Sequence, residues 1–172
     1  MIKTNIYRVR NAIRFKTSEA TNMWLLLGRT AAWTDELNPP APSITDVTLD
    51  DVIGAKRCTL QWVSPSPTGE ITLIGPSGEE KWTAYTDEAT AVAAGCHWVM
   101  VTGEVLGDEI PTTTFRQLGF FSGLVPTAGN EGLNALSAAQ IQSVGYVESI
   151  ENRQAYPRTA NSMYRAINIF EF

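Results

Sequence analysis

A chain of 172 residues with a net charge of −5 has the size of one domain, and folding should hide about 70% of the surface of the unfolded chain. The acidic balance argues against a protein that wraps nucleic acid, because such proteins carry a basic face. Basic residues cluster only at Arg8/Arg10 and Lys56/Arg57. No apolar run approaches the roughly 20 residues that cross a bilayer, and the start, Met-Ile-Lys-Thr-Asn, lacks a signal-peptide pattern. We expect neither nucleic acid nor membrane as a partner, and synthesis in the cytoplasm.

The first half of the chain alternates short apolar stretches with loop signals. Ile6–Phe15 mixes β-branched and aromatic residues with arginines, and Thr17–Ala20 is then expected to start a helix or form a turn. Trp24–Leu27 predicts a short buried strand. The prolines of Trp33–Pro42 remove donors and favour extended backbone, so this segment is expected to be a stiff surface loop close to polyproline II. Thr48–Ile53 has the pattern of one helical turn capped by its threonine.

The middle of the chain predicts strands and one helix. Cys58–Val63 is typical of a strand. Ile71–Ile74 and Lys81–Tyr85 flank the turn cluster Gly75–Gly78, which indicates a hairpin. The alanine-rich segment Asp87–Ala94 is the best helix candidate, with a cap at its start and a glycine directly after its end.

The second half is dense in β-forming residues. His97–Val105, Thr112–Phe121 and Val144–Ile150 predict strands, and Ser137–Gln140 predicts a short helical turn. Met163–Phe172 shows the period-two alternation of a strand with two distinct faces. Short strands separated by glycine and proline loops predict a mainly β chain, an antiparallel β-sandwich-like single domain over residues 1–172 with one or two short helices.

Two cysteines and one histidine are the residues best suited to carry chemistry. Cys58 and Cys96 are isolated and expected to be buried, reduced thiols. His97 should point to the face of its strand opposite to Cys96. Nucleophile-elbow, zinc-ligand and phosphate-loop motifs do not occur in the sequence. We therefore expect no catalytic residue, no metal and no cofactor, although a triad or carboxylate pair assembled from distant residues stays open.

Three separated groups of residues occur in a characteristic order. The first comprises Ile6-Tyr7-Arg8, Leu27-Gly28-Arg29-Thr30, Trp33 and Asn38-Pro39-Pro40. The second is Thr114-Phe115-Arg116-Gln117-Leu118-Gly119. The third comprises Gly145-Tyr146-Val147-Glu148, Glu151-Asn152-Arg153-Gln154-Ala155-Tyr156-Pro157 and the closing Ile167-Asn168-Ile169-Phe170-Glu171-Phe172. Their order resembles the peripheral baseplate wedge subunit of T-even-type contractile-tailed phages, gene product eight, and its shorter relatives in other phages.

The resemblance implies a β-sandwich-like structural protein without enzymatic activity. It implies a place in the virion, at the tail baseplate, with assembly in the host cytoplasm. The implied partners are other baseplate and tail proteins, and a homo-oligomer, a dimer, is suggested by the longer relative. Two other functions are kept as alternatives: a tail module that binds or degrades host-surface glycans, and a head–tail connector or tail-completion protein.

The motif residues can be given physical roles. Arg29 and Arg153 are expected to pair with carboxylates, and Asn152 is expected to hold a turn through side-chain-to-backbone bonds. Trp33 and the neighbouring prolines form the best interface candidate, because a stiff loop loses little entropy on docking and tryptophan is favoured at hot spots. Bracing of loops within the chain is as consistent with these residues as contact with a partner. The candidates for interface or loop bracing are Arg29, Trp33, Pro39, Pro40, Arg116, Gln117, Asn152 and Arg153.

Overall fold

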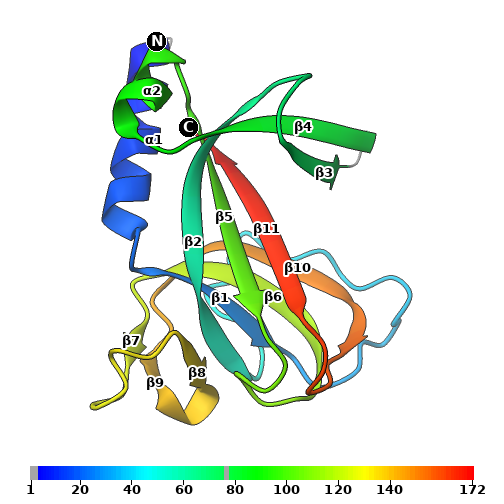
Figure 1. The fold of residues 1–172 in the computed structure, drawn as a ribbon. Helices are drawn as coiled ribbons and strands as arrows, with labels where there is room; N and C mark the ends of the chain where they lie inside the picture. The colour runs from blue at the N-terminus through cyan, green and yellow to red at the C-terminus, as the bar shows by residue number, and fades with distance from the viewer. Residues whose placement is uncertain (1–3, 76–77) are drawn as a thin grey trace. The chain divides into compact units, whose positions relative to one another are not determined.

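The computed structural model describes residues 4–75 and 78–172 and is mainly β, with antiparallel pairing and two α-helices (Figure 1). This confirms the fold class predicted from the sequence. The chain divides into two compact units, so the single domain over residues 1–172 stays a prediction. The first unit contains Met1–Ala20, Thr59–Val101 and Ile167–Phe172, and the second contains Thr21–Cys58 and Thr102–Ala166.

Three strands contribute residues to both units. They are β2 (Gly54–Pro65), β5 (Trp98–Val105) and β11 (Tyr164–Glu171). Strand β5 pairs with β11 and with β2. The strands predicted in these three segments of the sequence are thereby confirmed.

The first unit begins with helix α1 (Asn5–Glu19). Of the two alternatives for Thr17–Ala20, the helix start is wrong, because the helix ends at Glu19, and the chain turns from Ala20. The β-branched residues of this segment favour a strand, but its buried residues follow a helical spacing. Val9 and Ala12 are buried on one face, and the ring of Phe15 packs near two C-terminal phenylalanine rings. Burial of an amphipathic face outweighs modest local propensity. No helix in the described ranges, 4–75 and 78–172, is long and apolar enough to cross a membrane.

A second helix and a hairpin complete this unit, both as predicted. Helix α2 (Glu88–Ala93) begins after Asp87, whose carboxylate accepts a hydrogen bond from the Thr90 backbone N–H at 2.9 Å. Strands β3 (Ile71–Gly75) and β4 (Gly78–Tyr85) pair antiparallel. Pro76 and Ser77 of the predicted turn lie outside the described residues. One core cluster of this unit is formed by Val63, Trp82 and Met100, with Ile71, Leu73, Ala84, Trp98, Ile167 and Ile169 packed against it.

The second unit is built on a sheet in the order β10 (Tyr146–Pro157), β6 (Thr114–Ser122), β1 (Met23–Gly28) and the start of β2. Strand β1 is buried along its whole length, as predicted, because β2 and β6 pair with its two edges. One core cluster of this unit is formed by Trp24, Leu26, Leu49, Ala55, Phe121, Leu124 and Leu136.

Short elements lie at one end of this sheet. Strand β8 (Ala135–Ser137) pairs with the start of β2, and β7 (Val125–Pro126) pairs with β9 (Ile141–Ser143). Between β8 and β9 the chain forms the 3-10 turn η1 (Ala138–Gln140), at the place where a helical turn is predicted.

Two further predictions about this unit are wrong. Thr48–Ile53 contains no helical turn: Leu49 is drawn into the core, and Asp51 adopts a left-handed backbone with φ of 50°. Asn152 and Arg153 do not form a turn, because both lie inside β10, where Asn152 pairs with Gln117 of β6. In both places contacts distant in the sequence decide the local conformation.

Candidate functional site

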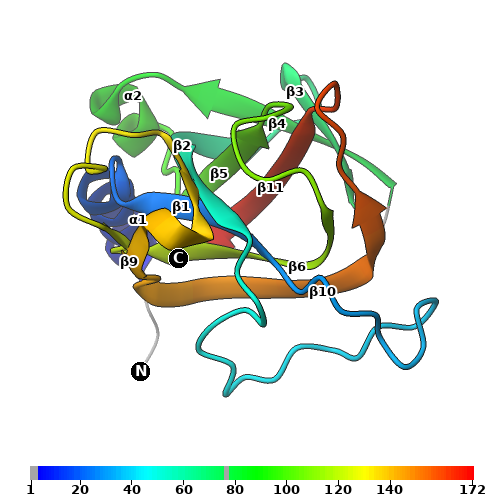
Figure 2. The same cartoon turned by 90° about the horizontal axis from the view of Figure 1, so that it is seen from below.

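The long connection between β1 and β2, residues 29–53, contains neither helix nor strand and runs beside β10 (Figure 2). We call this segment the braced loop. It begins at Arg29, whose φ of 54° lies in the left-handed region that non-glycine residues rarely adopt. The Arg29 guanidinium holds this start: its Nη1 lies 2.6 Å from Asp50 Oδ2 at the other end of the loop, and the group lies 3.7 Å from the Trp33 ring centroid. The two ends of the braced loop are therefore tied to each other.

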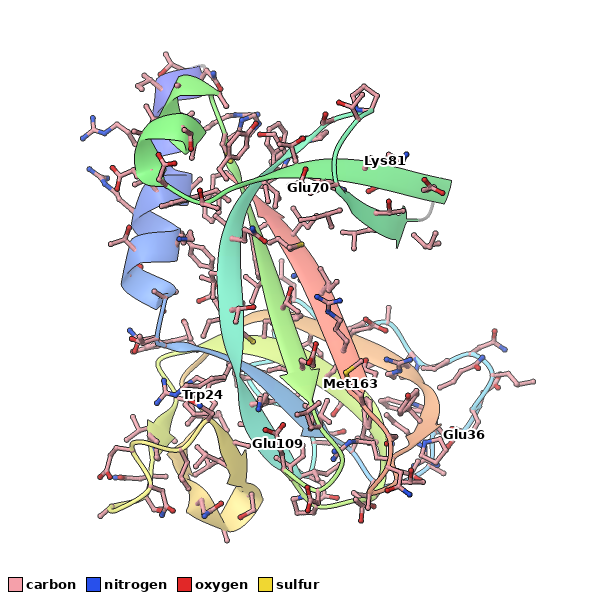
Figure 3. All side chains as sticks on the ribbon, viewed as in Figure 1. Trp24, Glu36, Glu70, Lys81, Glu109 and Met163 are labelled. Carbon is pink, nitrogen blue, oxygen red and sulfur yellow. The ribbon has the colours of Figure 1, made fainter. Side chains whose placement is uncertain are left out.

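Trp33 and Arg116 fix the first half of the braced loop on the sheet. The Trp33 indole N–H donates to the backbone carbonyl of Arg153 on β10 at 2.9 Å. Arg116 of β6 donates from Nε to Glu36 Oε1 at 2.6 Å and from Nη1 to the carbonyl of Thr30 at 2.5 Å. Figure 3 shows Glu36, a residue of the braced loop, at the edge of this sheet. A charge-assisted pair and an indole bond thus anchor one stretch of loop to two strands.

The protonation of Glu36 reflects this anchoring. Desolvation acts to raise the pKa of its carboxyl group, and the hydrogen bonds from Arg116 and from the Trp33 backbone N–H outweigh it. The pKa of Glu36 is therefore lowered from its ordinary value, and the carboxylate stays charged opposite the guanidinium.

A chain of amide hydrogen bonds fixes the second half. Gln117 on β6 is buried, accepts from the Asp50 backbone N–H at 2.7 Å and donates to Asn152 Oδ1 at 2.8 Å. Asn152 in turn donates to the carbonyl of Pro40 at 2.9 Å. Gln154 donates to the carbonyl of Leu37 at 2.9 Å. The side chains of β6 and β10 supply the hydrogen bonds that the backbone of an irregular loop requires.

Arg153 lies in an aromatic environment. Its guanidinium carbon is 5.6, 5.3 and 5.4 Å from the ring centroids of Phe115, Tyr156 and Tyr164, and it donates to the Tyr164 hydroxyl. Burial raises the pKa of Tyr164 to about 12. The expected carboxylate pairing is therefore corrected for Arg153: its guanidinium lies among aromatic rings and donates to a hydroxyl group, and its Nε is buried without a hydrogen-bond partner. Arg29 does pair with a carboxylate, as expected.

The eight predicted residues lie on or beside the braced loop. Five of them, Arg29, Arg116, Gln117, Asn152 and Arg153, use their polar groups for contacts inside the chain. Asn152 bonds to the distant Pro40 carbonyl, and not to a turn of its own. Pro39 is half-buried and Pro40 is exposed. A role for any of them in contacting a partner stays a prediction.

The sequence interpretation missed several residues of this region. Glu36, Asp50 and Gln154 supply partners, but nothing in their local sequence indicates which strand they meet. The large apolar side chains Leu37, Ile44 and Val47 lie on the braced loop and are exposed. Apolar residues without periodicity inside a proline-rich loop were the available signal, because such residues have no core face to join.

Next to Ile44 a shallow groove of about 390 Å³ is lined by residues 42–44, 46 and 147–150.

Loss of the Gln117 amide is expected to loosen the braced loop. In Gln117→Leu, the Asp50 N–H and the Asn152 side chain lose a partner, which costs about 1–3 kcal/mol per unsatisfied group. Amide hydrogen exchange followed by mass spectrometry should then show faster exchange in residues 29–50. Gln142→Leu, which changes an exposed glutamine on β9, is the control and should exchange like the original chain. Unchanged exchange in Gln117→Leu would contradict the bracing role.

None of the residues considered for chemistry belongs to the braced loop. Cys58 and Cys96 are buried and free, and burial raises the pKa of the Cys58 thiol. His97 stacks on Trp98 with 3.4 Å between ring centroids, and its Nδ1 lies 3.1 Å from the carbonyl of Gly95. Within residues 4–75 and 78–172 no group of three or more His, Cys, Asp or Glu side chains is arranged to hold a metal ion.

Comparison with known proteins identifies the group to which the chain belongs. Residues 1–172 match the family described as "Baseplate wedge 3 tail fiber network component". The chain belongs to this family. It is also 35% identical over 164 residues to "Virion protein 3" of Enterococcus phage phiEF24C, which covers 93% of this chain and 88% of that protein.

Family membership confirms the predicted resemblance to baseplate wedge subunits. The chain is a structural subunit of the phage tail baseplate and a component of the virion. As a component of the baseplate it interacts with other tail proteins. These findings favour the baseplate over the two alternatives, a glycan-directed tail module and a head–tail connector or tail-completion protein.

Proposed function

We propose that the chain acts in the baseplate wedge by presenting the braced loop as a preformed docking surface for a neighbouring tail protein, and that it catalyses no reaction. The observation that carries this proposal is that the polar and the apolar groups of the loop face in different directions. Polar groups of the loop bond inward to β6 and β10, whereas Leu37, Ile44 and Val47 stay outside.

Preorganisation makes such a loop suited to binding. A flexible loop loses conformational freedom when it docks, and this loss subtracts from the affinity. The braced loop is already ordered by its bonds to the sheet, so most of that cost is met during folding. Its exposed apolar side chains then add buried apolar area on contact, at about 25 cal/mol per Å². Irregular backbone with large exposed apolar residues is typical of an interaction site.

Assembly provides the test. In Leu37→Asp/Ile44→Asp, two exposed side chains change, so stability should shift by less than about 0.5 kcal/mol per site. A partner surface, by contrast, would have to desolvate two carboxylates. A phage lacking this gene is complemented with the variant, and the subunit in purified virions is quantified by mass spectrometry. We expect incorporation to fall at least about tenfold, which corresponds to about 1.4 kcal/mol.

The control moves the same substitution to other exposed apolar positions. The control variant is Ile74→Asp/Met163→Asp. Ile74 lies on β3 and Met163 directly precedes β11, and both side chains are exposed. Normal incorporation of this control together with poor incorporation of the loop variant supports the docking role. Equal incorporation of both variants would refute it.

The remaining parts of the proposal concern partners. The acidic chain is proposed to bind neither nucleic acid nor membrane and to be made and assembled in the host cytoplasm. A homodimer is the expected oligomeric state, on the basis of the resemblance alone. Sedimentation velocity of the purified chain distinguishes a monomer from a dimer.

A further inference from the structure

The outward face of α1 carries two arginines that have no partner within the described part of the chain. Arg10 and Arg14 lie one helical turn apart, and both are exposed. Neither takes part in an ion pair, hydrogen bond or ring contact among residues 4–75 and 78–172. The other arginines all have partners: Arg8, Arg29, Arg57, Arg116, Arg153, Arg158 and Arg165.

Two large apolar side chains share this face. Ile6 is 58% exposed and lies four residues before Arg10, so Ile6, Arg10 and Arg14 form one row along the helix. Tyr7 is 47% exposed and lies three residues before Arg10. Arginine and tyrosine are among the residues most enriched at binding hot spots. The face therefore combines charge with apolar surface.

The opposite face of α1 packs against other residues of the chain. Val9 and Ala12 are buried, and the Trp62 indole N–H donates to the carbonyl of Ala12 at 3.4 Å. The Phe15 ring lies 5.4 Å from that of Phe170 and 5.0 Å from that of Phe172. These contacts hold the helix in one rotation about its axis. Because the row formed by Val9, Ala12 and Phe15 already packs inside the chain, it is not available for insertion into a membrane, as the apolar face of an interfacial helix must be.

The charge of α1 is opposite to that of the rest of the chain. Four basic residues and one acidic residue give the helix a net +3, and the whole chain carries −5, so the remainder carries −8. An acidic remainder repels a polyanion such as nucleic acid, and two arginines neutralise too few phosphates to overcome it. A short acidic protein segment avoids this repulsion, because it requires only local complementarity.

We propose that the face formed by Ile6, Tyr7, Arg10 and Arg14 docks an acidic segment of another tail protein. Each guanidinium donates two parallel hydrogen bonds to one carboxylate of the partner. The two carboxylates should lie about 5–6 Å apart, the spacing of helical neighbours, and an apolar residue of the partner should contact Ile6 and Tyr7. This interface is independent of the braced loop and involves different chemistry.

Charge reversal tests the proposal. Arg10→Glu/Arg14→Glu is introduced by complementation of a phage lacking the gene, and the subunit in virions is quantified. We expect at least an about tenfold loss of incorporation, since desolvated charge pairs at interfaces commonly contribute more than 1.4 kcal/mol. Lys81→Glu/Arg165→Glu gives the same change in net charge at exposed positions and should incorporate normally. Arg10→Gln/Arg14→Gln, which keeps helix propensity without charge, should show an intermediate loss if the reversed variant fails to fold.

Suppressor selection identifies the partner. Passage of the charge-reversed phage should yield substitutions of Asp or Glu by Lys or Arg in a second tail protein. Normal incorporation of both Arg10/Arg14 variants would overturn the proposal. So would Arg10- and Arg14-dependent binding of the purified chain to a double-stranded DNA oligonucleotide or to vesicles of phosphatidylcholine and phosphatidylglycerol. Failure of the Leu37→Asp/Ile44→Asp variant alone would concern only the braced loop.

Discussion

Replacing Phe115 by alanine is expected to lower the free energy of unfolding by about 3–5 kcal/mol. Phe115 is fully buried on β6, and its ring centroid lies 5.3 Å from that of Tyr156 and 4.9 Å from that of Tyr164. The substitution removes the ring, leaves a cavity and takes away one of the surfaces on which the Arg153 guanidinium lies. Because Arg153 also offers its carbonyl to Trp33, the damage should extend to the braced loop.

Urea denaturation followed by tryptophan fluorescence measures this effect. Phe115→Leu keeps most of the apolar volume and is the matched control, with an expected loss of less than about 1.5 kcal/mol. If Phe115→Ala lowered the free energy of unfolding by less than about 1 kcal/mol, the neighbouring side chains would have to fill the cavity completely. That result would contradict the close packing described for β6 and β10.

Replacing Arg158 by methionine is expected to cost about 3 kcal/mol, since four backbone carbonyl groups lose their donor together. Arg158 follows β10 and is only 5% exposed. Its two terminal nitrogens donate to four backbone carbonyls of the connection between β5 and β6, those of Leu106, Gly107, Ile110 and Pro111. One guanidinium therefore holds a whole loop, and methionine keeps the unbranched stem of the side chain but removes the donors.

Arg165→Met provides the comparison for this effect. Arg165 is an exposed arginine whose Nε lies 3.8 Å from Glu104 Oε2, and exposed pairs of this kind contribute about 0–1 kcal/mol. Thermal and chemical unfolding of the two variants should therefore differ clearly. Similar stabilities of Arg158→Met and Arg165→Met would contradict the role assigned to the buried guanidinium.

The strands could be predicted because apolar density and alternation report directly on burial. Strand β1 is buried on both faces and reads as an unbroken apolar run. Helix α1 was harder, since Ile6, Val9 and Ile13 are β-branched and local propensity competes with the helical spacing of the face that packs. Asn152 and Arg153 look like loop residues. Asn152 lies in a strand because it pairs with Gln117 of β6, and Arg153 follows it at an irregularity in the register of β10. The braced loop supplies partners for the Asn152 amide and the Arg153 carbonyl.

The residues of the candidate site could be predicted from the sequence, but the hydrogen bonds and ion pairs between them could not. The ordered motifs identify Arg29, Arg116 and Gln117, but the partner of each lies 21 to 80 residues away in the sequence. Only the fold brings Glu36 to Arg116 and Asp50 to Arg29. The sequence also carries no periodicity that marks Leu37 or Ile44 as outward-facing. Exposure of such side chains becomes evident when the inward bonds of the loop are known.

An electron-microscopy map of the intact tail, at a resolution that resolves side chains, tests the central claim most directly. Every copy of this chain should lie in the baseplate, with Leu37 and Ile44 of the braced loop buried against another tail protein. The bonds from the loop to β6 and β10 should be the same as in the isolated chain, since a preformed surface docks without rearrangement. A braced loop that faces solvent in all copies, or that leaves the sheet on assembly, would contradict the account.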